Sequence, residues 1–395
     1  MKAKQLVIVL VLLAVLGGAA LWLSKRNEAS WSSTATRADA KVITFPLNDV
    51  SQITIKDAGA ETNLIKKEEL WTVRERDYPA DFDKVSFLVR RLWELKPVQQ
   101  VKAGASQLGR LQLTPPTAEP TSGTSIELKG AGDKRLAAVL LGKNQLREVE
   151  QGGYPIGRYV MPEDGSNHVF MISEMFADLQ TKPEQWVSRE FTKVENPKLI
   201  SLTSPDPGMN WTLMRESATA EWKLADPKPG EEFDPSKVSA LTGALSNPAM
   251  TDVLPADTPA IEQPTVARVE TFDGLIYEIR IGKLSGENYP VLVSVSGEVA
   301  KQRTPAADEK PGDKARLDQE FEARQKQLTD KLAKEQKLQG RQYLLAKITL
   351  DQVLKDRSAW MMAKPSPSPA LPPAPVTSPA PAAAPKPASP TPKKK

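Results

Sequence analysis

An internal repeat limits the possible folds of this chain more than any other feature. A first set of landmarks begins with the alternating residues Ile53 to Lys56 and leads through short apolar runs to Trp71-Thr72-Val73. A second set begins at Ile200 and leads in the same order to Trp222, which lies 151 positions after Trp71. Alternation with a period of two predicts strands, so each copy is expected to begin with an antiparallel meander.

A helix is predicted after the meander in both copies. Asp81 and Asp234 are favourable N-cap residues. Pro97 and Pro248 follow the two helices and end them. Between these limits apolar residues recur at helical spacing, namely Val85, Leu88, Val89, Leu92 and Leu95 in the first copy and Val238, Leu241 and Leu245 in the second.

Further strand candidates follow each helix, and each copy then ends in a short helix and a tryptophan, Trp186 or Trp360. We therefore predict an α+β fold with two duplicated domains, residues 45–192 and residues 193–363. Each domain is expected to pack an antiparallel sheet on helices.

The second copy contains a charged insertion, residues 297–340, that the first copy lacks. Residues 318–337 are predicted to form a helix, because oppositely charged residues recur four positions apart. Two interpretations of this helix remain open. It is a solvated excursion, or it docks a partner through a thin apolar stripe formed by Leu317, Phe321, Leu328 and Leu332.

The N-terminal segment predicts a membrane anchor. Residues 6–23, LVIVLVLLAVLGGAALWL, contain no charge. As a helix they span about 27 Å, close to the ~30 Å hydrocarbon core of a bilayer. We expect a transmembrane signal anchor over residues 1–26 and a linker over residues 27–44. A cleaved secretory signal is the alternative, and both interpretations export the rest of the chain.

The C-terminal segment, residues 364–395, contains twelve prolines and no acidic residue. A composition dominated by Pro, Ala, Ser and Lys predicts a disordered tail, partly in polyproline II conformation. The tail is interpreted as a solvated spacer. The alternative is a tether whose Lys393-Lys394-Lys395 end meets an anionic polymer or lipid.

The charge and the rare residues exclude several classes of protein. The net charge of +4 includes seven lysines at the two ends, namely Lys2, Lys4 and five in residues 364–395, so residues 5–363 carry a net charge of −3. A slightly acidic folded region argues against a nucleic-acid binder. The absence of cysteine excludes disulfides and thiolate metal sites. His168 is the one histidine, so a metal site of several imidazoles is excluded. We therefore predict neither a metal nor a cofactor.

The sequence carries no catalytic motif. His168 lacks the Gly-x-Ser-x-Gly turn of many serine hydrolases, and a position in a turn or at a strand edge is favoured. Gly142-Lys143 and Gly282-Lys283 lack the rest of a phosphate-binding loop, so strand and turn positions are favoured there too.

Two further groups have both a structural and a functional interpretation. Asp81 and Asp83 form a carboxylate pair, but the recurrence of an aspartate at Asp234 favours capping over acid–base chemistry. Tryptophans recur at equivalent landmarks of the two copies, namely Trp71, Trp186, Trp211, Trp222 and Trp360. They either pack in the core, which we favour, or line a groove for glycan or peptide.

Several of these landmarks together resemble one family. They are the basic start with its apolar run, the strand Leu70-Trp71-Thr72-Val73, the cap Tyr78-Pro79-Ala80-Asp81, and the helix pattern Val85-x-x-Leu88-x-x-x-Leu92. They resemble the DUF4340 family over most of residues 45–360, in two copies. That family has no established biochemical activity, and its members resemble auxiliary proteins of gliding-motility-type ABC export systems. The resemblance implies a membrane-anchored envelope protein and no catalytic residue.

The expected function is therefore a non-catalytic accessory or scaffolding subunit of an ABC-type export complex. We expect it in the bacterial inner membrane, with most of the chain in the periplasm beside an ABC-type permease or its companion subunits, and without a small-molecule substrate. The alternative is a module that binds an envelope polymer such as peptidoglycan or polysaccharide. A hydrolase that uses His168 is a third hypothesis.

Overall fold

The computed structural model describes residues 34–35, 40–117, 119–149, 152–305, 309–310 and 312–362. The predicted signal anchor, residues 1–26, and the predicted tail, residues 364–395, lie outside these ranges, so both remain predictions. Within the described ranges, no helix combines the length and the apolar composition needed to span a membrane.

The first half of the chain forms a ten-stranded antiparallel sheet in the order β1-β6-β10-β9-β8-β7-β2-β3-β4-β5. The helices α2 (Phe82–Trp93) and α3 (Ala105–Leu108) belong to this half. The strands are β1 (Thr34–Ala35), β2 (Gln52–Lys56), β3 (Glu61–Lys67), β4 (Leu70–Val73), β5 (Tyr78–Pro79), β6 (Gln99–Val101), β7 (Thr124–Lys129), β8 (Arg135–Val149), β9 (Gly152–Pro162) and β10 (Val169–Ile172).

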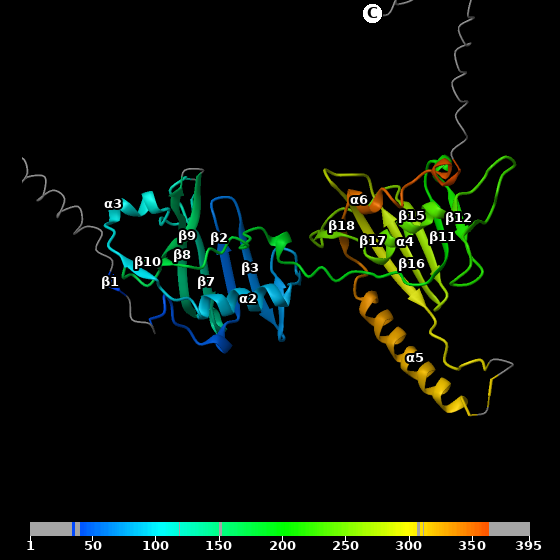
Figure 1. Ribbon diagram of the computed structural model, residues 1–395, viewed down its shortest axis with the longest axis horizontal. Helices are drawn as coiled ribbons and strands as arrows, with labels where there is room; N and C mark the ends of the chain where they lie inside the picture. The colour runs from blue at the N-terminus through cyan, green and yellow to red at the C-terminus, as the bar shows by residue number, and fades with distance from the viewer. Residues whose placement is uncertain are drawn as a thin grey trace, which may run out of the picture.

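The second half forms an eight-stranded antiparallel sheet in the order β13-β12-β11-β15-β16-β17-β18-β14. Its helices are α4 (Val238–Ser246), α5 (Lys314–Gln336) and α6 (Lys347–Leu350). Its strands are β11 (Pro197–Thr203), β12 (Trp211–Met214), β13 (Lys223–Leu224), β14 (Met250–Val253), β15 (Thr265–Thr271), β16 (Leu275–Ile281), β17 (Asn288–Gly297) and β18 (Gln342–Ala346). Figure 1 shows the two sheets side by side along the long axis of the molecule.

The strand orders reveal that the two sheets are copies of one topology. In the first sheet, β4-β3-β2-β7-β8-β9-β10-β6 corresponds strand for strand to the complete second sheet. The helices α2 and α4 occupy the same place in the chain order, and β1 and β5 are additions at the edges of the first sheet. The predicted α+β fold with an internal repeat is thereby confirmed.

The two repeats also close in the same way. The backbone N–H of Asp81 donates to the carbonyl oxygen of Trp186 at 2.7 Å, and that of Asp234 donates to the carbonyl oxygen of Trp360 at 2.9 Å. The Asp81 side chain accepts a hydrogen bond from the backbone N–H of Lys84, and the Asp234 side chain accepts one from that of Ser236. The predicted capping role of both aspartates is therefore confirmed.

The tryptophans pack mainly in the cores. Trp186, Trp211 and Trp360 are buried, and the rings of Trp211 and Trp360 meet edge to face at a centroid distance of 5.1 Å. Trp71 and Trp222 are half-buried and pack against the same core. The core interpretation is confirmed for the three buried rings, whereas the other two reach the surface.

An ion pair joins the two sheets. Arg76 lies in the turn between β4 and β5, and Asp252 lies in β14 at the edge of the second sheet. The guanidinium donates to both carboxylate oxygens, at 3.0 Å from Nε and 2.9 Å from Nη2. The two side chains are only 19 % and 11 % exposed, so each charge needs the other for compensation. Hydrogen bonding to Asp252 raises the pKa of Arg76 despite its burial.

Aromatic side chains pack across the same interface. Tyr343 of β18 meets Tyr78 of β5 edge to face at a centroid distance of 6.0 Å, and it meets Phe191 at 4.9 Å. All three rings are buried. Most buried apolar residues of the two sheets belong to one continuous cluster, beside a smaller cluster in the first repeat, so the repeats share a core.

Two arginines add hydrogen bonds across the same interface. Arg189, in the segment that joins the sheets, donates to the carbonyl oxygens of Met250 and Glu184 at 2.9 and 2.7 Å. Arg341 donates to two carbonyl oxygens in the turn between β4 and β5, at 3.2 and 2.7 Å. The backbone of this turn is therefore held directly by the second repeat.

A second arginine cluster fixes the end of the second repeat. Arg357 is buried and donates to Glu231 at 2.8 Å and to Asp226 at 3.1 Å. These bonds join the chain next to Trp360 to the segment that precedes α4. Hydrogen bonds from Arg357 lower the pKa of Glu231 from 4.5 to about 2.

We expect Arg76→Ala to lower the free energy of unfolding by about 2 kcal/mol, because Asp252 stays buried without its partner. Asp252→Ala should have a similar effect, and the double variant should lose much less than the sum of the two. Urea denaturation of the full chain measures these values. The control is Lys67→Ala, which removes an exposed ion pair with Asp77. Additive losses in the double variant would contradict a compensated pair.

We also expect Arg357→Met to reduce the acid sensitivity of folding. The pKa of Glu231 is lower in the folded chain than its ordinary value, so this pair stabilises the fold above about pH 4.5 and loses its effect as the pH falls toward 2. Denaturation between pH 5 and pH 2 should show a shallower loss of stability in the variant. Arg280→Met, at an exposed pair with Glu278, is the control. Parallel acid profiles for Arg357→Met and the native chain would count against this assignment.

Candidate functional site

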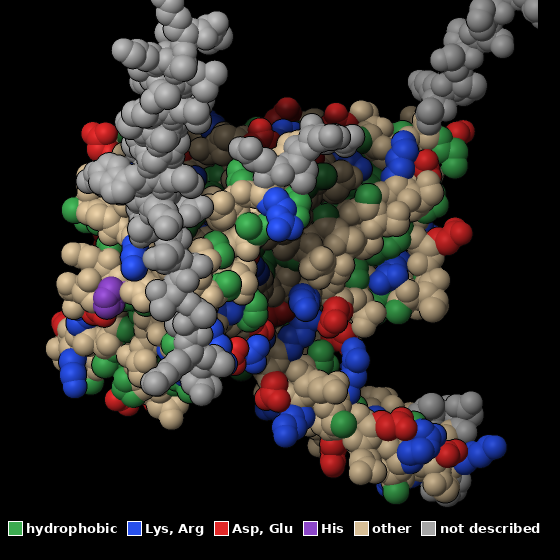
Figure 2. Space-filling model, turned by 60° about the vertical axis from the view of Figure 1, so that its left-hand side comes forward, with side chains coloured by type: hydrophobic (Ala, Val, Ile, Leu, Met, Phe, Trp, Pro, Cys, Tyr) green, Lys and Arg blue, Asp and Glu red, His purple; other side chains and the backbone are tan. Residues whose placement is uncertain are grey.

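The helix α5 carries the four residues predicted to dock a partner. Leu317, Phe321, Leu328 and Leu332 are all half-buried. Leu328 and Leu332 pack against the core of the second repeat, whereas Leu317 and Phe321 lie on the outer half of the helix and outside that cluster. Figures 1 and 2 show α5 extending away from the sheets, with charges of both signs along its surface in the space-filling view. The docking role itself remains a prediction.

A buried carboxylate attaches the inner end of α5 to the sheet. Glu335 is 5 % exposed. Its carboxylate accepts hydrogen bonds from the Tyr277 hydroxyl at 2.8 Å and from the backbone N–H of Lys193 at 3.0 Å. Burial, together with the charge of Glu335, raises the pKa of Tyr277, so the phenol stays protonated and remains a donor.

Surface ion pairs extend this attachment along the helix. Lys331 bonds to Glu195 at 2.6 Å, and Lys334 bonds to Glu190 at 2.9 Å. Both acidic residues lie in the segment between the two sheets. The inner half of α5 is therefore held on the chain that connects the repeats, and its outer half extends beyond them.

The outer half of α5 is held by its own preceding loop. Arg303 bonds to Asp318 at 2.8 Å and forms a short ion pair with Glu309. Hydrogen bonds to Glu309 and Asp318 raise the pKa of Arg303, so this cation keeps its charge. The loop and the helix therefore form one charged projection.

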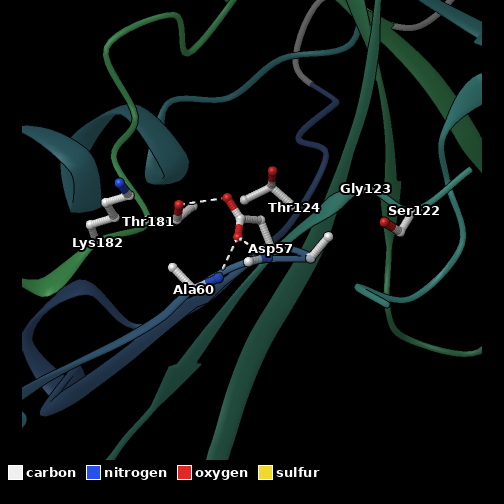
Figure 3. A pocket seen from close by; sticks show the side chains of 9 residues that line it. Asp57, Ala60, Ser122, Gly123, Thr124, Thr181 and Lys182 are labelled. Carbon is white, nitrogen blue, oxygen red and sulfur yellow. Dashed lines mark hydrogen bonds between the residues drawn. The ribbon is translucent and has the colours of Figure 1, made fainter. Parts of the chain in front are cut away.

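A polar hollow of about 270 Å³ lies at the turn between β2 and β3 (Figure 3). Asp57 accepts hydrogen bonds from the backbone N–H groups of Gly59 and Ala60 at 2.8 and 2.7 Å and from the Thr181 hydroxyl. Partial burial acts to raise the pKa of Asp57, but these hydrogen bonds and the charge of Lys182 lower it overall. The carboxylate is thus an ionised turn residue that already has three donors.

A second hollow, of about 460 Å³, lies between α4 and the start of β11. Its walls include Trp222 and Arg215 on one side and Ser239, Thr242 and Ser246 of α4 on the other. The Arg215 guanidinium lies 4.9 Å from the centre of the Trp222 ring. We call this hollow the α4 groove.

The other sequence candidates lie apart from both hollows. His168 is exposed before β10 (purple in Figure 2), and its ring meets Phe170 edge to face at 6.3 Å. Gly142-Lys143 lies inside β8, and Gly282-Lys283 follows β16, so neither pair begins a helix as a phosphate-binding loop requires. Among the described residues, no group of three or more His, Asp or Glu is arranged to hold a metal.

Sequence reasoning missed the α4 groove, although a signal for it was present. The repeat aligns Val85 with Val238, at an offset of 153. The same offset places Gly243 opposite Arg90, and Ser246 opposite Trp93. Small residues on a helix face leave room for a hollow beside it.

Residues 71–265 match the family described as "Domain of unknown function (DUF4340)". The match begins in β4 of the first repeat and ends at the start of β15 in the second, so the matched stretch crosses the interface between the repeats. The predicted family is confirmed over this range, which is shorter than the predicted range of residues 45–360. No curated protein and no solved structure matches this chain.

We expect Tyr277→Phe to loosen α5, because one oxygen of the buried Glu335 carboxylate loses its donor. The free energy of unfolding should fall by about 1–2 kcal/mol. Hydrogen exchange followed by mass spectrometry should show faster exchange in α5. Tyr289→Phe removes a hydroxyl bonded to Asp351 at a half-buried position and is the control. Unchanged exchange in α5 of Tyr277→Phe would contradict the proposed attachment.

Proposed function

We propose that this protein is a non-catalytic, membrane-anchored scaffold of an ABC-type export complex, with most of its chain in the periplasm of a bacterial cell. The apolar run at residues 6–23 supports the anchor. The DUF4340 match supports the accessory role through the resemblance of that family to auxiliary export proteins. The partner in this proposal is the permease or one of its companion subunits.

The observation that carries the proposal is that the two repeats pack together as one rigid body. The buried Arg76–Asp252 pair and the continuous apolar core fix their relative positions. A rigid body holds a bound partner at a defined distance from the membrane without loss of conformational entropy on binding. The outer half of α5 adds a projecting surface, and Leu317 and Phe321 are half-buried on it.

The polar groups of the Asp57 hollow support a structural role rather than chemistry. A general base needs a lone pair that is available to a substrate proton. The Asp57 carboxylate instead accepts three hydrogen bonds within the chain, and these bonds lower its pKa. Its role is to fix the turn between β2 and β3.

The envelope-polymer alternative has one supporting observation. Trp222 is half-buried and lines the α4 groove, and a tryptophan that lines a hollow can contact a sugar ring. A pulldown on isolated cell wall, with the full chain and with a chain that lacks residues 364–395, distinguishes this alternative from the scaffold. Retention on the wall that depends on the tail and on Trp222 would favour polymer binding.

The scaffold proposal predicts co-purification with transporter subunits. Purification of the full chain from native membranes in mild detergent, followed by mass spectrometry, should recover an ABC permease or its companion subunits. The double change Leu317→Glu, Phe321→Glu should reduce this recovery at least about tenfold, because charge on the apolar face of α5 opposes docking. Ala315→Glu, Ala323→Glu on the exposed face of the same helix is the matched control. Recovery of the protein alone, or only with wall fragments, would contradict the scaffold.

A further inference from the structure

The α4 groove lies beside helix positions that carry smaller side chains than the matching positions of the first repeat. In α2, Trp93 is 38 % exposed with its ring centre 3.5 Å from the Lys41 ammonium, and Arg90 is exposed as well. At the equivalent positions of α4, Ser246 replaces Trp93 and Gly243 replaces Arg90. The hollow of about 460 Å³ therefore has small residues along its α4 side.

One wall of the groove contains the flat side chains of Trp222 and Arg215. The Arg215 guanidinium lies 4.9 Å from the centre of the Trp222 ring. Hydrogen bonds from Arg215 to the carbonyl oxygens of Pro197 and Ala218 hold the guanidinium in this position.

The opposite wall is polar and small. It consists of Ser239, Thr242, Gly243 and Ser246 along one face of α4. A groove with an indole ring and a guanidinium plane on one side and small polar groups on the other suits a polyproline II segment, whose proline rings pack on flat side chains while its backbone stays solvated.

The chain itself contains a proline-rich segment after the last described residue. Residues 365–395 include twelve prolines and the run Leu371-Pro372-Pro373-Ala374-Pro375. The tail starts close to α4, because the backbone N–H of Met362 donates to the carbonyl oxygen of Glu232 at 2.7 Å. Glu232 lies two residues before Asp234, whose side chain caps the turn that leads into α4.

The length of the tail is sufficient to reach the groove. Residues 363–375 in polyproline II conformation span about 40 Å. The nine residues of α4 span about 14 Å. Because the tail is tethered near the helix, its effective concentration at the groove is in the millimolar range, and a weak intrinsic affinity is enough for substantial occupancy.

We propose that the proline-rich tail binds back in the α4 groove of the same chain, with the segment Leu371 to Pro375 lying across Trp222. This assignment is independent of the export role, because it concerns contacts within one chain. In this arrangement the tail covers the aromatic surface that would otherwise be open to other ligands.

The absence of cysteine in the natural sequence allows a direct test in the full chain. The variant Ser246→Cys, Ala374→Cys places one thiol in the groove and one in the tail. The control variant Ser294→Cys, Ala374→Cys places the first thiol at an exposed position of β17, a strand that does not line the groove. Under mild oxidation, the groove variant should form an intrachain disulfide at least about tenfold faster than the control.

A second comparison keeps the test independent of folding. Changing Pro372, Pro373 and Pro375 to alanine leaves the folded body and the tail length unchanged. In the Ser246→Cys, Ala374→Cys background it should bring the disulfide rate down to that of the control. Equal rates for the groove and control variants, or no effect of the alanines, would overturn the proposal. A disulfide formed mainly between two chains would also overturn it and assign the groove to a second copy.

Discussion

The ion pair between Arg76 and Asp252 decides whether this chain behaves as two modules or as one body. Each charge is nearly buried, and either one without its partner would lower the stability of the fold. Separating the repeats therefore leaves both charges without their partners. Tyr343 packs on Tyr78 and Phe191 and adds an aromatic contact across the same interface. The inner half of α5 is held close to this junction as well, because Lys331 and Lys334 bond to acidic residues in the segment that joins the repeats.

The differences between the repeats are where specific roles can arise. Both copies keep the same strand order and the same closing hydrogen bonds at Trp186 and Trp360, so selection for folding accounts for these features. The second copy alone has α5, inserted between β17 and β18, and alone has small residues along α4. A projecting helix on a rigid double module suits a protein that binds other chains, which is the role we propose.

Local sequence patterns predicted most of the fold. Period-two alternation and helical spacing located the meanders, α2 and α4, and the aspartates at positions 81 and 234 marked the helix starts. The interface could not be predicted, because Arg76 and Asp252 are 176 positions apart and no local pattern connects them. The part of the α5 stripe that packs on the core could not be predicted either. Sequence alone does not distinguish Leu328, which packs on the core, from Leu317, which does not. Gly243 and Ser246 indicated the groove only once the repeats were aligned.

The rigid union of the repeats can be measured directly as a distance. Because the chain has no natural cysteine, spin labels can be placed on Lys134→Cys in the first repeat and Asp257→Cys in the second, both at exposed positions. Pulsed electron paramagnetic resonance should give one narrow distance distribution that broadens in the Arg76→Ala variant. A broad distribution in the otherwise native chain would contradict a shared core and a fixed interface.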